Sequence, residues 1–167
     1  MHEFIITDDQ RKRAFEISFP DQVFNQNKTG ERAGMVGALA EIIVSDYLGV
    51  KPHAYKKDDG SVYDFDIDLF DIKLEVKTMN VYKAPTLDSD CCLTDYYDQK
   101  CDVYVFTAIL NDQSKGWIEG WIRKKDFNKT EKFIPAGTVR ERDGFTYKWN
   151  NHIVHVKDLN DIGRLKV

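Results

Sequence analysis

The stretch VYDFDIDLFDIKLEVKT, residues 62–78, consists of two runs in which apolar and charged residues alternate. This period of two is typical of β-strands that bury one face and expose the other. Because only Phe70 and Asp71 separate the runs, the stretch predicts an antiparallel hairpin, although this pair is not one that two-residue turns favour. The polar face of the hairpin carries three aspartates, one glutamate and two lysines: Asp64, Asp66, Asp68, Glu75, Lys73 and Lys77.

Two pairings of the strands are compatible with this pattern. A turn centred on Phe70 and Asp71 sets Asp64 opposite Lys77, Asp66 opposite Glu75 and Asp68 opposite Lys73. A slip of one residue on each strand sets Asp64 across from Glu75 instead. In either register, carboxylates from neighbouring strands meet on one face of the sheet.

The chemistry of that face points to a metal site. Carboxylates a short distance apart repel one another, and a bound Mg²⁺ relieves this repulsion. Lys77 projects to the same side as Glu75, where its ammonium can orient an attacking water or stabilise charge on a phosphorane, while the metal lowers the pKa of that water. These are the parts of phosphodiester hydrolysis. The alternative interpretation is a solvated strand face with cross-strand ion pairs worth about 0.2–1 kcal/mol each.

The segment before the hairpin predicts a helix over Glu31–Leu48. Thr29 is an N-cap candidate, Gly49 supplies a stop, and apolar residues recur at helical spacing at Met35, Leu39, Ile42 and Ile43. A second stripe of this helix contains small residues and one acid: Gly34, Gly37, Ala38, Glu41 and Ser45. We expect this stripe to lie close against a neighbouring element, with Glu41 in the contact zone or, alternatively, on the helix surface.

The remaining segments predict further sheet. Asp95–Lys100 is a candidate short helix, Val103–Leu110 an apolar strand, Trp117–Ile122 a strand, and Ile153–Val156 a last short strand. Asp143-Gly144 is the strongest hairpin signal and joins Thr138–Arg142 to Phe145–Trp149. The expected fold is α/β, a mixed domain with a central sheet.

Composition indicates one cytoplasmic domain. The 167 residues lack repeats, low-complexity tracts, a secretory signal and an apolar run long enough for a membrane helix, and their net charge is −4. Cys91, Cys92 and Cys101 suit neither a disulfide framework nor a zinc site, so reduced thiols are expected. Residues 1–28 are read either as a helix and strand or as an N-terminal extension, 29–110 as the core, and 111–167 as a β-rich C-terminal part.

The acidic face, followed by Glu75-Val76-Lys77 and preceded by a helix with Glu41, resembles the PD-(D/E)XK nuclease superfamily. The resemblance covers about 31–79, with 103–110 similar to the next core strand. It implies a restriction-endonuclease-like core, in which a central mixed sheet with an antiparallel meander is flanked by helices; C-terminal β-hairpins would follow. Tyr63 stands where the motif has proline, and the acid-x-lysine triplet alone is common, since this chain has it three times.

The resemblance also implies roles for individual residues. Asp64 and Glu75 would hold Mg²⁺, with Mn²⁺ as a substitute, Lys77 would be essential, and Glu41 would act as an auxiliary acid. Asp66 competes with Asp64 as the metal ligand; Asp64 is favoured because it lies beside Lys77 at the open end of the hairpin. The predicted activity is hydrolysis of DNA, and many enzymes of this class act as homodimers. The alternative is a catalytically inactive nuclease-fold protein that binds DNA or a partner protein.

Candidate DNA contacts are polar residues outside the acidic face. They comprise Lys56, Lys57, Gln99, Lys100, Lys124, Arg140 and Arg142. Basic side chains bind DNA phosphates, although the same residues are equally compatible with solvated surface loops.

Overall fold

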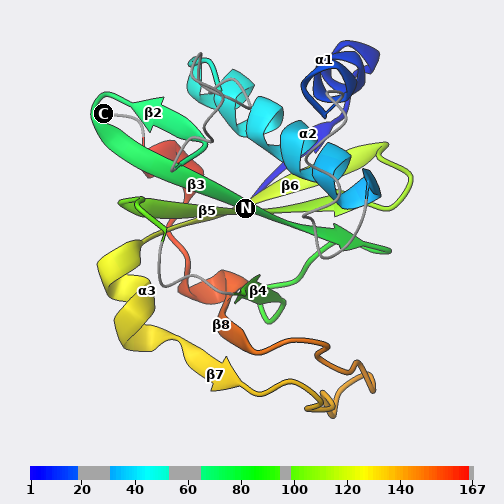
Figure 1. The fold of residues 1–167 in the computed structure, drawn as a ribbon, viewed down its shortest axis with the longest axis vertical. Helices are drawn as coiled ribbons and strands as arrows, with labels where there is room; N and C mark the ends of the chain where they lie inside the picture. The colour runs from blue at the N-terminus through cyan, green and yellow to red at the C-terminus, as the bar shows by residue number, and fades with distance from the viewer. Residues whose placement is uncertain (19–30, 53–64, 95–98, 166–167) are drawn as a thin grey trace.

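The computed structural model describes residues 1–18, 31–52, 65–94 and 99–165 (Figure 1). In chain order, its helices and strands are β1 (His2–Ile5), α1 (Asp8–Ser18), α2 (Glu31–Leu48), β2 (Ile67–Leu69), β3 (Ile72–Val81), β4 (Asp90–Leu93), β5 (Val103–Leu110), β6 (Lys115–Arg123), α3 (Lys124–Thr130), β7 (Lys132–Ile134) and β8 (Asn151–His155). Two 3₁₀ turns, Val156–Asp158 and Ile162–Arg164, follow β8. No helix of the described residues is both long and apolar enough to cross a membrane.

The strands form two sheets. The main sheet has the order β1-β6-β5-β3-β2, and only its β3–β5 pair is parallel. A smaller antiparallel sheet has the order β4-β8-β7. Figure 1 shows α1 and α2 on one face of the main sheet, with α3 and the smaller sheet on the other. The predicted α/β class with a mixed sheet is confirmed, but the described part of the predicted meander is limited to the β2–β3 hairpin.

That hairpin has the first of the two predicted registers. Asp68 pairs with Lys73 and Ile67 with Leu74, so the turn is centred on Phe70 and Asp71. Both turn residues have positive φ, 49° and 69°, as a type I′ turn requires. The Asp71 N–H donates to Asp68 Oδ1 at 3.0 Å, which stabilises the turn despite its unusual sequence. The alternative register, with a slip on each strand, is wrong.

Helix α2 ends as its sequence predicts. Gly49 adopts φ 73°, and the N–H groups of Gly49 and Val50 donate to the carbonyls of Asp46 and Ser45. This pair of bonds is the Schellman motif that terminates many helices. Of the apolar stripe that the sequence predicts, Leu39, Ile42 and Ile43 are buried in a core with Val105 of β5, whereas Met35 is half-buried. Thr29, the predicted N-cap, lies outside the described residues.

Both ends of the chain differ in detail from the prediction. Over residues 1–18 the N-terminal segment forms a packed strand and helix, since β1 pairs with β6 and α1 contacts α2; residues 19–28 lie outside the described residues. The predicted Asp143-Gly144 hairpin forms in part: the N–H groups of Arg140 and Tyr147 donate to the carbonyls of Phe145 and Thr138, but its arms are not regular strands. Helix α3 and strands β4 and β7 were not predicted. Of the predicted helix Asp95–Lys100, residues 95–98 are outside the described part and the last two residues have no regular structure.

Glu119 of β6 is a buried carboxyl group between the main sheet and the layer below it. Glu119 is 4% exposed. The thiol Sγ of Cys91 on β4 donates a hydrogen bond to Glu119 Oε2 at 3.7 Å. Burial raises the pKa of Glu119 from 4.5 to about 7, while the thiol hydrogen bond acts in the opposite direction. The folded protein therefore holds this proton more tightly than the unfolded chain does.

A Glu119→Gln variant is expected to raise the free energy of unfolding by roughly 2–3 kcal/mol at pH 8. Because folding raises the pKa of Glu119, the wild type loses stability as the pH rises from 4.5, the pKa in the unfolded chain, through about 7, the pKa in the folded protein. The neutral glutamine avoids this loss, so the gain should vanish near pH 4. Urea unfolding at the two pH values measures the difference.

The matched control is Glu141→Gln, which changes an exposed glutamate and should alter stability by less than about 0.5 kcal/mol at either pH. An equal gain for Glu119→Gln at both pH values, or no gain at pH 8, would contradict the expectation.

Candidate metal centre

Glu75 and Lys77 of β3 form an ion pair on one face of the main sheet. Their neighbours Leu74 and Val76 point into the core that α2 covers, so alternation directs Glu75 and Lys77 to the opposite face. Lys77 Nζ lies 2.7 Å from Glu75 Oε1, and the two side chains are 29% and 12% exposed. The predicted projection of both residues to one side is observed.

Asp66 joins this pair from the segment just before β2. Its backbone N–H donates to the Leu74 carbonyl, and its Oδ2 accepts the Val76 N–H at 2.7 Å. Burial and the negative charge of Glu75 raise the pKa of Asp66 to about 7, against the effects of the Val76 N–H and Lys77. Asp64, the aspartate that the sequence favoured as a metal ligand, lies outside the described residues.

Glu41 of α2 interacts electrostatically with the same group, although α2 covers the face of the sheet opposite to Glu75 and Lys77. Its pKa is raised well above the ordinary value by burial and by the charges of Asp66 and Glu75, while Lys77 lowers it. The side chains of Glu41, Asp66, Glu75 and Lys77 thus lie close enough to interact electrostatically; we call these four residues the acidic cluster.

The small residues around Glu41 pack only in part as predicted. Ala38 and Ser45 of the same stripe are buried, and α2 lies against β3. At Gly37, no described atom lies within 4 Å of the position that a Cβ would occupy. The stripe therefore combines close packing with local space near the cluster.

The acidic cluster has the donor atoms that a hard cation takes. It offers three carboxylates and neither thiol nor imidazole, and oxygen ligands of this kind suit Mg²⁺. Mutual repulsion and burial hold the pKa of two of these acids high, a strain that a bound cation would relieve. In the described part of the chain, no three His, Cys, Asp or Glu side chains converge closely enough to enclose a metal ion.

Two of the predicted DNA contacts lie beside the cluster instead of on a loop surface. Gln99 Nε2 donates to Glu75 Oε1 at 3.2 Å, and Lys124 Nζ donates to the backbone carbonyl of Gln99. Lys100 is exposed. Sequence reasoning did not find these bonds, because Gln99, Glu75 and Lys124 come from separate segments with no pattern that links them.

The other predicted DNA contacts gain no support from the structure. Arg140 and Arg142 both contact the buried carboxylate of Asp90, and Arg140 also pairs with Asp143. The paired guanidiniums keep their charge, but the neighbouring carboxylates offset its attraction for a phosphate. Lys56 and Lys57 lie outside the described residues.

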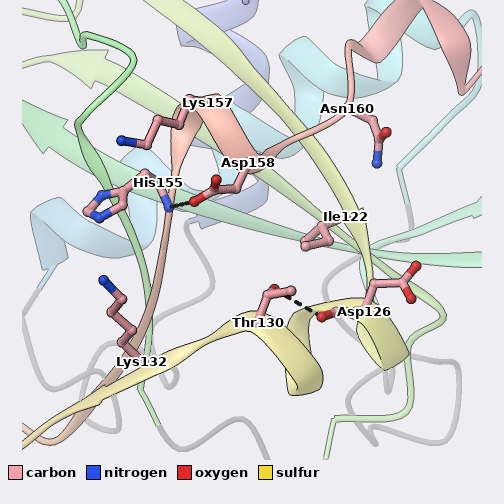
Figure 2. A pocket seen from close by; sticks show the side chains of 8 residues that line it. All are labelled: Ile122, Asp126, Thr130, Lys132, His155, Lys157, Asp158 and Asn160. Carbon is pink, nitrogen blue, oxygen red and sulfur yellow. Dashed lines mark hydrogen bonds between the residues drawn. The ribbon is translucent and has the colours of Figure 1, made fainter.

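A cavity of about 580 Å³ lies between α3, β8 and the turn after β8 (Figure 2). Its lining residues are Ile122, Asp126, Thr130, Lys132, His155, Lys157, Asp158 and Asn160. The lining includes two aspartates, two lysines and a histidine, and Lys157 is already paired with Asp88 at 2.7 Å. The lining therefore has no dominant charge that would select an ion, and it contains no residue of the acidic cluster.

Comparison of the chain with protein-family models, curated proteins and solved structures finds no match. The function must therefore be inferred from the chemistry of the acidic cluster.

Proposed function

We propose that this chain is a Mg²⁺-dependent DNA nuclease with a restriction-endonuclease-like core, of the PD-(D/E)XK type. The observation that carries the proposal is the acidic cluster, in which an aspartate before β2, a glutamate and a lysine on β3, and a glutamate on α2 interact. The antiparallel β2–β3 hairpin next to a parallel β5 is compatible with such a core.

Each residue of the cluster has a role in this proposal. Asp66 and Glu75 would hold the cation, with Asp64 as a further candidate ligand from the segment before Asp66 and Glu41 as an auxiliary acid that supports a second metal or acts through a water. When bound, Mg²⁺ lowers the pKa of a coordinated water and offsets the charge of phosphate oxygens. Lys77 keeps an ammonium within reach of the site, where negative charge builds up as the phosphodiester bond is attacked.

A second candidate is a nuclease-fold protein without activity that binds DNA or a protein partner. The observation that favours it is the direct ion pair between Glu75 and Lys77, since two groups that neutralise each other need no cation. In this case the acidic cluster would be a structural feature of the sheet.

The direct test uses purified protein with plasmid, linear and branched DNA in Mg²⁺ or Mn²⁺. The proposal expects metal-dependent cleavage of at least one substrate, and its loss in EDTA. If the wild type and the Glu75→Ala variant are equally inactive on all substrates in both metals, the enzyme proposal is wrong.

Metal binding should also be visible as stabilisation. At a Mn²⁺ concentration about 100-fold above its dissociation constant, the melting temperature should rise by roughly 5–10 °C, because the folded state alone binds the ion. Glu75→Ala should abolish the rise, which differential scanning fluorimetry measures. Glu16→Ala, which removes an exposed carboxylate on α1, should retain it; an equal rise in Glu75→Ala would mean that the ion binds elsewhere.

A further inference from the structure

Glu75 receives hydrogen bonds from two side chains at the same oxygen. Lys77 Nζ lies 2.7 Å from Oε1 and Gln99 Nε2 lies 3.2 Å from it. Two donors on one oxygen fix the orientation of the carboxylate and leave its second oxygen available to a ligand. Because the glutamine donor is neutral, it orients Glu75 without adding positive charge that would repel a cation.

The amide of Gln99 is oriented by its surroundings. If its oxygen and nitrogen were exchanged, two oxygens would face each other at Glu75, so the nitrogen must point to the carboxylate. The amide oxygen is then buried, and it has no hydrogen-bond partner among the described residues. A buried oxygen of this kind is costly unless a bound group satisfies it.

Gln99 has no helix or strand of its own to hold it, yet its segment is tied down at several points. Lys124 Nζ at the start of α3 donates to the Gln99 carbonyl, and the Lys124 N–H donates to the Asp102 carbonyl at 2.9 Å. Asp102 in turn exchanges hydrogen bonds with the backbone of Lys73 on β3. The segment 99–102 therefore bridges α3 and the strand that carries the acidic cluster.

We propose that Gln99 is a positioning residue that orients Glu75, and that Lys124 holds Gln99 in place, which makes α3 a support of the metal centre. The inference rests on the proposed function. It assigns to Gln99 and Lys124 a role in metal binding, in place of the direct phosphate contact that the sequence suggested. Residues that orient a metal ligand in this way typically change metal affinity or activity by 10–100-fold when they are replaced.

The test measures Mn²⁺ affinity by isothermal titration and steady-state DNA cleavage for the same set of variants. Gln99→Met, which keeps the volume but loses the amide, and Lys124→Ala are expected to weaken Mn²⁺ binding at least about 10-fold. They should also lower kcat while leaving the KM for DNA unchanged. Lys124→Arg, which keeps a donor, should recover most of the loss. Lys125→Ala, an exposed lysine one position along α3, should match the wild type.

A role in phosphate contact gives a different result. It would raise the KM for DNA and leave the Mn²⁺ dissociation constant unchanged, and that outcome would overturn the inference. If the wild type binds Mn²⁺ and cleaves DNA while Gln99→Met equals it in both measurements, the inference alone fails. If the wild type neither binds Mn²⁺ nor cleaves any substrate, the proposed function fails and the inference fails with it.

Discussion

Replacement of Lys77 by alanine is expected to slow Mg²⁺-dependent DNA cleavage by about 10²–10³-fold, the cost of removing one group that stabilises charge in a transition state. The Lys77 ammonium is paired with Glu75 and is partly exposed. It can therefore move toward a phosphate oxygen that gains negative charge without disrupting β3. The cluster also loses its only cation, so Mn²⁺ affinity should be kept or increased. Single-turnover cleavage and Mn²⁺ titration measure these two effects.

This combination distinguishes Lys77 from the carboxylates around it. Glu75→Ala should lose both metal affinity and cleavage, whereas Lys77→Ala should lose cleavage alone. Lys83→Ala, an exposed lysine just beyond β3, is the matched control and should keep the wild-type rate. Cleavage by Lys77→Ala at the wild-type rate would remove this residue from the proposed mechanism.

The parts of the site that could be predicted from the sequence are those with local patterns. The alternation around Phe70 and Asp71 predicts the hairpin but leaves two registers open, because both keep the same side chains on the buried face. The turn at Phe70 and Asp71, where both residues have positive φ, goes with the observed register. Helical spacing and Gly49 likewise fix α2 and the position of Glu41. These two patterns predict the elements that carry Glu41 and Glu75, whereas the proximity of the two residues was expected only from the family resemblance.

The choice between aspartates lies beyond such patterns. Asp66 shares its alternation with Asp64 and Asp68, yet in the structure it precedes β2, and its side chain accepts the Val76 N–H. The hydrogen bond from the Val76 N–H to the Asp66 side chain depends on the residue at which β2 and β3 stop pairing. Periodicity does not specify that point.

The sequence did not predict helix α3, because its position also depends on contacts between distant segments. Its sequence KKDFNKT has no side-chain cap at the first turn and buries only Phe127. That one ring packs against Tyr104 of β5, with a centroid distance of 5.5 Å. Tertiary packing therefore determines this helix, and a contact between segments far apart in the chain leaves no periodic signal.

Replacement of Asp90 by alanine is expected to lower the free energy of unfolding by roughly 3 kcal/mol, because it leaves the partners of a buried carboxylate, among them the buried Tyr147 hydroxyl, without their acceptor. The Asp90 side chain, 3% exposed, pairs with Arg140 and Arg142. It also accepts the Tyr147 hydroxyl at 2.6 Å. These bonds attach the segment after β7 to the smaller sheet, so the variant should release that segment.

An Asp88→Ala variant is the matched control, because it also removes one negative charge but from an exposed position. Asp88 is 70% exposed and has a surface ion pair with Lys157, so Asp88→Ala should cost no more than about 1 kcal/mol. Urea unfolding measures both values, and limited trypsin digestion reports release of the segment, since Arg140 and Arg142 are cleavage sites within it. If Asp90→Ala and Asp88→Ala are equally stable and equally resistant, Asp90 does not anchor the segment, and Arg140 and Arg142 regain their interpretation as DNA contacts.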